Sequence, residues 1–179
     1  MKIGSVAWGW TPTPEDMPEG DSLKRIADAV KELGFDGIDY LSAFDSLDGF
    51  FTEKACKELS AHVADIGLEM GGLVFQSDLW NQPDKAVQDT QLAYFAKCCK
   101  AAGHLGAGTI SCIIPRPYGA KSNRKGSPSE KTALNLPADY SWEKDWNLFA
   151  AMMAKASDMA ADAGLRIALE CFPGSLCST

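Results

Sequence analysis

The clearest pattern in the sequence is an alternation of amphipathic stretches with short apolar runs. Each amphipathic stretch is rich in alanine, ends at a glycine and is followed at once by an apolar run, and this unit occurs at 26–41, 59–75, 96–114 and 154–172. A further apolar run, KIGSVAW at 2–8, precedes them all. Since helices repeat every 3.6 residues and buried strands are short and apolar, the pattern predicts one strand followed by four helix–strand pairs.

The ends and faces of the expected helices can also be read from the pattern. A glycine in left-handed conformation commonly ends a helix before a strand, and the candidates are Gly34, Gly67, Gly106 and Gly164. Apolar residues at helical spacing predict the face of the first helix that packs on a sheet, namely Leu23, Ile26, Ala27, Val30 and Leu33. The same spacing predicts the core face of the last helix from Trp142, Trp146, Phe149 and Met153.

The expected strands indicate a parallel sheet. They lack polar and apolar alternation, as strands do when both faces of a parallel sheet are covered, and repeated units of this kind form either a doubly wound sheet or a β/α barrel. Polar or aromatic residues recur where the strands end, which favours the barrel because its active site is built there; they are Trp8, Trp10, Asp39, Tyr40, Gln76, Arg116 and Glu170. The glycines at 103, 106 and 108 precede a strand, so they are not a phosphate-binding turn.

Length and charge limit the domain count and the class of partner. A chain of 179 residues that is 46% hydrophobic is long enough for one domain, residues 1–179, but five strands do not close an eight-stranded barrel, so the chain is expected to be an incomplete one. The net charge of −7 argues against nucleic acid and anionic membranes as partners and leaves small molecules. No secretory signal is recognisable at the N-terminus, and the placement of the six cysteines suggests reduced thiols, so a cytoplasmic protein is expected.

With this order of strands, the sequence resembles the sugar phosphate isomerase/epimerase family, whose members share the xylose isomerase-like TIM barrel. The resemblance runs from KIGSVAWGW through LGFDGIDYL to AGLRIALECFPGS. The last segment is the most specific, because the family carries a metal-binding glutamate at the end of its fifth strand and Glu170 matches it. Many members continue with Asn-His, whereas Cys171-Phe172-Pro173-Gly174 resembles the subset that reads Glu-x-x-Pro-Gly. The resemblance implies a (β/α)8 TIM barrel of which this chain supplies about the first five βα units.

The resemblance further implies a divalent-metal-dependent isomerase or epimerase that moves a proton next to a carbonyl of a sugar or sugar-like substrate. Glu170 would be a metal ligand and a catalytic acid or base, with Mn, Mg, Co or Zn as the cofactor. The family's other ligands belong to later strands that this chain lacks, so the 1–179 segment alone is expected to be inactive. Members are often homo-oligomers. The alternative is that Glu170 is a structural carboxylate paired with Arg116 or a lysine.

Five further residues are candidates for substrate binding. The indole rings of Trp8 and Trp10 could shield the site from water or stack on a sugar, although core packing explains them as well. Arg116 could hold a hydroxyl, carboxylate or phosphate, or be a solvated surface residue. Asp39 and Gln76 have the polar groups that sugar hydroxyls need, although such residues often only cap the next helix.

Other readings of the same sequence remain open. A non-catalytic ligand-binding barrel shares the fold, and so does a DNA-repair nuclease of the endonuclease IV type. The nuclease needs several zinc ions, whereas both histidines, His62 and His104, fall near helix C-termini and are expected to be structural. The long polar connection at 117–139 predicts either a functional lid or a mobile loop.

Overall fold

The described part of the chain is built around a parallel five-stranded sheet. The structure is a computed structural model that describes residues 1–7, 20–42, 47, 51–77, 79–122 and 134–177. The strands of the sheet are β1 (Gly4–Val6), β2 (Gly37–Ser42), β3 (Glu69–Phe75), β4 (Thr109–Ile113) and β7 (Arg166–Glu170). They lie in the order β1-β2-β3-β4-β7, which is their order along the chain, and every pairing is parallel.

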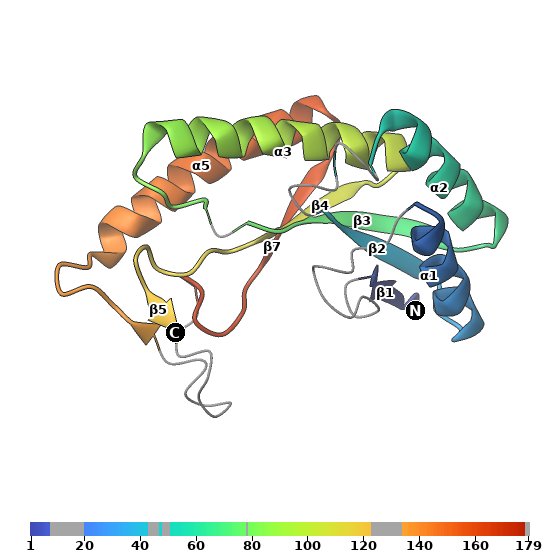
Figure 1. Cartoon of the computed structure of the whole chain (residues 1–179), viewed down its shortest axis with the longest axis horizontal. Helices are drawn as coiled ribbons and strands as arrows, with labels where there is room; N and C mark the ends of the chain where they lie inside the picture. Colours follow the sequence, from blue (N-terminus) through green and yellow to red (C-terminus); the bar gives the residue numbers. More distant parts are fainter. Residues whose placement is uncertain (8–19, 43–46, 48–50, 78, 123–133, 178–179) are drawn as a thin grey trace.

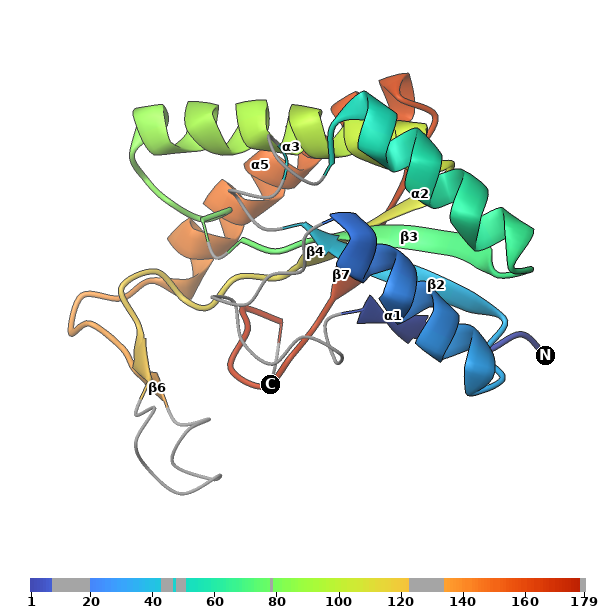
Figure 2. The same cartoon turned by 45° about the vertical axis from the view of Figure 1, so that its right-hand side comes forward.

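The helices connect successive strands. They are α1 (Gly20–Glu32), α2 (Glu53–Asp65), α3 (Lys85–Leu105) and α5 (Trp142–Asp162). Figures 1 and 2 show all of them on the same side of the sheet. The predicted order of one strand followed by four helix–strand pairs is therefore confirmed. The glycines predicted to end the helices have positive φ angles of 72° to 82°, which glycine adopts without the steric cost that other residues meet.

The core lies between the sheet and the helices. Alternate strand residues such as Ile38, Tyr40, Leu73 and Ile110 are at most 1% exposed and pack in one apolar cluster with residues of the helices. The strand residues between them point to the other face, on which the described part of the chain places no helix. Residues there, such as Val6, Asp39 and Ser111, keep part of their surface exposed. Val74, which lies on the same face, is only 6% exposed. The two faces of the sheet therefore differ in environment, and among the described residues the face away from the helices is covered in part.

Two predicted apolar faces need correction at their first or last residue. Leu33 is 63% exposed and lies just beyond the last residue of α1, Glu32, in the turn that leads to β2. Trp142 is 52% exposed, because it opens the first turn of α5 and stacks on Trp146, with ring centroids 5.4 Å apart. The rest of the predicted face is confirmed, because Phe149 is buried and Trp146 and Met153 pack against the core, which also includes Met152, Ala156 and Ala160 of α5.

The long connection after β4 contains short elements that the sequence pattern does not predict. Two residues on each side, β5 (Lys121–Ser122) and β6 (Leu134–Asn135), form a small antiparallel sheet apart from the main one. It lies beside the start of α5 in Figure 1. Residues 123–133 of the predicted lid or mobile loop are outside the described residues. Among the helices that the structure describes, none is both long and apolar enough to span a membrane.

Candidate active site

The carboxyl ends of the parallel strands meet at one edge of the sheet, and three predicted site residues lie there. Glu170 is the last residue of β7, and Gln76 follows directly on Phe75, the last residue of β3. Arg116 lies three residues after the end of β4. Gln76 and Glu170 are exposed and Arg116 is half-buried. The predicted position at the strand ends is confirmed for these residues, while their roles stay predictions.

The register of β7 places Glu170 on the face of the sheet away from the helices. Leu169 pairs with Cys112, which is completely buried against the helices, whereas Glu170 pairs with Ile113. Since neighbouring residues of a strand point to opposite faces, the Glu170 carboxylate points to the open face. Among the ion pairs of the described residues, none involves Glu170.

Backbone hydrogen bonds fix the segment that follows Glu170 against the segment that follows β4. The Ile114 amide donates to the Glu170 carbonyl at 3.0 Å, and the Leu176 amide donates to the Pro115 carbonyl at 2.9 Å. The Trp142 indole Nε1 donates to the Leu176 carbonyl at 3.2 Å, which adds a contact from α5. Figure 1 shows the two segments next to each other, the first in red and the second in yellow. The backbone around Glu170 is therefore held from two sides.

Arg116 belongs to this pair of segments. Its guanidinium carbon lies 5.2 Å from the centre of the Phe172 ring, two residues beyond Glu170, a geometry in which cation and ring attract each other. The side-chain amide of Asn81 donates to the Arg116 carbonyl at 2.8 Å, and Asn81 itself is only 1% exposed. Asn81 was not predicted from sequence, and nothing in its local pattern distinguishes it from other loop asparagines.

Asp39 lies deeper in the sheet than predicted. It was expected at the end of its strand, but β2 continues to Ser42, so Asp39 is in mid-strand and half-buried on the face away from the helices. It lies beside Gly71 and Gly72 of β3, where the register between the two strands is irregular. Burial raises the pKa of the Asp39 carboxyl above its ordinary value of 3.8, and a hydrogen bond from the Gly72 amide partly offsets this.

The described residues do not form a complete metal site. No group of three or more His, Cys, Asp and Glu side chains comes together among them, whereas a bound divalent ion needs several protein ligands. Glu170 is therefore a single candidate ligand. Both histidines lie in the last turns of their helices, as predicted, and His62 Nε2 is 2.8 Å from Asp28 Oδ1 of α1. Trp8 and Trp10 lie outside the described residues.

Comparison with solved structures identifies the same arrangement of strands and helices in sugar epimerases. The 3-keto-D-glucoside 4-epimerase of E. coli superposes with a TM-score of 0.64 at 18% identity, over 94% of this chain and 55% of that protein. The D-allulose 3-epimerase of Methylomonas sp. gives a TM-score of 0.66 at 17% identity, over 94% and 51%. A sugar phosphate isomerase/epimerase of Parabacteroides distasonis gives 0.55 at 14% identity, over 95% and 51%.

These likenesses show the fold, and the chain spans about half the length of the solved structures that it matches. The curated protein sequences gave no match. A family model described as the xylose isomerase-like TIM barrel matches residues 27–179, which is most of the chain. The five parallel strands and their helices are thus a part of such a barrel, with about five βα units. The chain belongs to the xylose isomerase-like TIM barrel family.

Proposed function

We propose that the whole protein is a divalent-metal-dependent sugar isomerase or epimerase in which Glu170 takes part in catalysis. The observation that supports this most directly is the position of Glu170. It ends β7, an edge strand of the five-stranded sheet, points to the face without helices and has an exposed side chain. Active sites of β/α barrels are built at this end of the strands. The solved structures with this fold include ketose 3-epimerases and a keto-glucoside 4-epimerase by their names.

The role proposed for Glu170 follows from what a carboxylate can do at that place. A carboxylate oxygen can accept a proton from a carbon next to a carbonyl, and the other oxygen can remain a ligand or hydrogen-bond acceptor. A divalent ion, when bound, would polarise the substrate carbonyl and so make that carbon more acidic. Because no group of three or more ligand side chains comes together among the described residues, the remaining ligands are proposed to come from outside them.

Arg116 and Gln76 are proposed to contact the substrate. Arg116 is held over Phe172 by its cation–π contact, and its backbone is held by Asn81, so its guanidinium is kept close to the Glu170 segment. Gln76 offers an amide that can both donate to and accept from a hydroxyl. Side chains fixed in this way lower the entropy lost when a substrate is positioned.

The proposal can be tested with the natural full-length protein in D2O. A panel of ketohexoses and aldohexoses is incubated with the enzyme, and proton NMR follows the exchange of the hydrogen next to the carbonyl. We expect exchange with at least one sugar, its loss after chelation and its return with Mn²⁺ or Mg²⁺. We expect Glu170→Gln to lower kcat/KM by about 100-fold or more, the range of general acid–base catalysis.

Glu143→Gln is the matched control, because it makes the same chemical change at an exposed carboxylate in the first turn of α5. It should keep the wild-type rate. Activity of Glu170→Gln within twofold of the wild type would refute the role of Glu170. If no sugar exchanges its proton while the protein still binds sugars, the protein is a binding barrel without catalysis, and the proposal of an enzyme is wrong.

A further inference from the structure

The segment that follows Glu170 carries two exposed cysteines. Cys171 comes directly after the end of β7, and Cys177 lies further along the same segment. Both are free thiols, and they differ in exposure from the other cysteines of the sequence, which are buried, namely Cys56, Cys98, Cys99 and Cys112. Exposed thiols meet reagents from solution, whereas buried cysteines among apolar residues are inert. Thiol chemistry in the native protein is therefore expected at these two residues.

A tight turn reverses the chain between the two cysteines. The Ser175 amide donates to the Phe172 carbonyl at 3.0 Å, and Gly174 has a φ angle of 87°. A proline followed by a glycine with positive φ is typical of the middle of a type II β-turn, and Pro173 and Gly174 provide this pair. Figure 1 shows the segment after β7 bending back, drawn in red. The turn directs the second cysteine back toward the first.

The residues just before the two cysteines are bonded to neighbouring positions of the segment after β4. The Glu170 carbonyl accepts from the Ile114 amide at 3.0 Å, and the Leu176 amide donates to the Pro115 carbonyl at 2.9 Å. Since consecutive Cα atoms are only about 3.8 Å apart, these bonds hold Glu170 and Leu176 near each other. The two cysteine side chains, which follow directly on these residues, hydrogen-bond to each other. Backbone and side chains therefore agree that the two thiols are in contact.

Two thiols in contact can be joined by exchange with a small-molecule disulfide such as oxidised glutathione. The thiolate of one cysteine attacks a glutathione sulfur, the S–S bond of glutathione breaks and one glutathione leaves. The second cysteine then attacks the protein sulfur of this mixed disulfide, and the other glutathione leaves. Each protein sulfur loses one electron, both electrons reduce the oxidised glutathione, and the two thiol protons are carried away by the two glutathione thiols.

We propose that Cys171 and Cys177 are a redox-sensitive pair, which a small-molecule disulfide closes into an intramolecular disulfide and a dithiol reductant reopens. Their exposure admits the reagent, and their contact favours the second exchange step. The disulfide would close a ring that includes Phe172, on which the Arg116 guanidinium lies. The inference does not rest on the proposed function, because neither thiol has a role in it.

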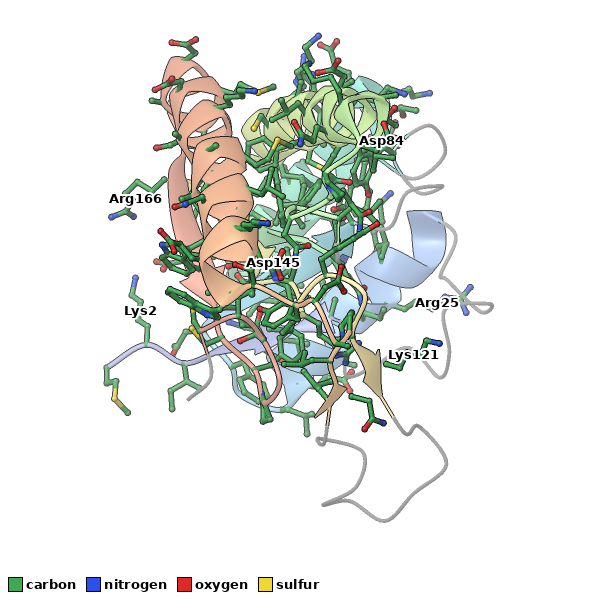
Figure 3. The ribbon with its side chains drawn as sticks, turned by 90° about the vertical axis from the view of Figure 1, so that its left-hand side faces the viewer. Lys2, Arg25, Asp84, Lys121, Asp145 and Arg166 are labelled. Atoms are coloured by element: carbon green, nitrogen blue, oxygen red, sulfur yellow. The ribbon has the colours of Figure 1, made fainter. Side chains whose placement is uncertain are left out.

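The test incubates the natural full-length protein, at micromolar concentration, with millimolar oxidised glutathione and maps its peptides by mass spectrometry without reduction. Arg166, which points away from the ribbon in Figure 3, is the last basic residue of the sequence, so trypsin releases both cysteines on one peptide that begins at Ile167. We expect this peptide to be lighter than its dithiol form by two hydrogen atoms, and dithiothreitol should reverse the change. A thiol in the same segment acts at millimolar effective concentration, whereas the released glutathione is only micromolar, so the disulfide should exceed the mixed disulfide by about tenfold or more.

The single variants Cys171→Ser and Cys177→Ser each remove one thiol at an exposed position. We expect each to retain one glutathione, because the second exchange step has no attacking thiol. Cys56→Ala is the matched control, because it removes a buried thiol of α2 and should leave the disulfide unchanged. The proposal is wrong if the wild-type peptide stays in the dithiol form, if it retains glutathione as the single variants do, or if a non-reducing gel shows that the disulfide joins two chains.

Discussion

Gly71 of β3 leaves the space that the Asp39 carboxylate of β2 occupies. A Cβ built on Gly71 would overlap Asp39 Oδ1 and lie 3.3 Å from its Cγ. In Gly71→Ala the carboxylate must therefore rotate away, and it then loses the hydrogen bond from the Gly72 amide. Loss of a hydrogen bond to a charged group costs about 1.5–3 kcal/mol. Alanine restricts the unfolded chain more than glycine does, which raises the free energy of unfolding by about 0.5–1 kcal/mol.

We therefore expect Gly71→Ala to lower the free energy of unfolding by about 0.5–2.5 kcal/mol, the difference between these two effects. Urea unfolding of the natural full-length protein measures it as a lower midpoint with an unchanged slope. Asp39→Ala removes the overlapping side chain, so in that background Gly71→Ala should raise the free energy of unfolding by about 0.5–1 kcal/mol, the effect of alanine on the unfolded chain. Gly108→Ala is the matched control, because nothing lies within 4 Å of its Cβ position. Additive effects of the two substitutions, within about 0.5 kcal/mol, would refute the steric argument.

Two further predictions concern charge and exposure. Because burial raises the pKa of Asp39, the folded state holds this proton more tightly than the unfolded state; the stability that Asp39 contributes is complete below pH 3.8 and is lost as the pH rises through the folded-state pKa. Asp39→Asn should therefore have a higher free energy of unfolding than the wild type at pH 7, and this difference should disappear toward pH 3. A difference in unfolding free energy that does not change with pH would contradict the prediction. Iodoacetamide should modify Cys171 and Cys177 in the native protein much faster than the buried cysteines, as measured by peptide mass mapping. Modification of Cys98 at the same rate would contradict this prediction.

Much of the fold follows from sequence patterns because its elements depend on neighbouring residues. The helix-ending glycines and the apolar runs after them depend on local conformation, and the structure has helix ends and strands at the predicted places. Leu33 and Trp142 were misplaced because helical spacing says which residues share a face, but it does not say where the helix leaves the sheet. The β5 and β6 pairing was missed because two residues on each side carry no periodic signal.

The candidate site was only partly predictable. The position of Glu170 at a strand end could be predicted, because Glu170 directly follows an apolar run and that run forms β7. Asp39 was placed too near the edge, because the length of β2 is set by its partner β3 and not by its own residues. Asn81 could not be found at all, since it acts through the Arg116 carbonyl, a backbone group distant in sequence.

The order of strands in the sheet, which equals their order along the chain, has a consequence for how the protein folds. Each strand pairs with the strand made just before it, so every βα unit finds its partner already present when it leaves the ribosome. Synthesis at about 5–20 residues per second is slow compared with the closing of such short loops. The sheet can therefore grow by one strand at a time during translation, from β1 to β7.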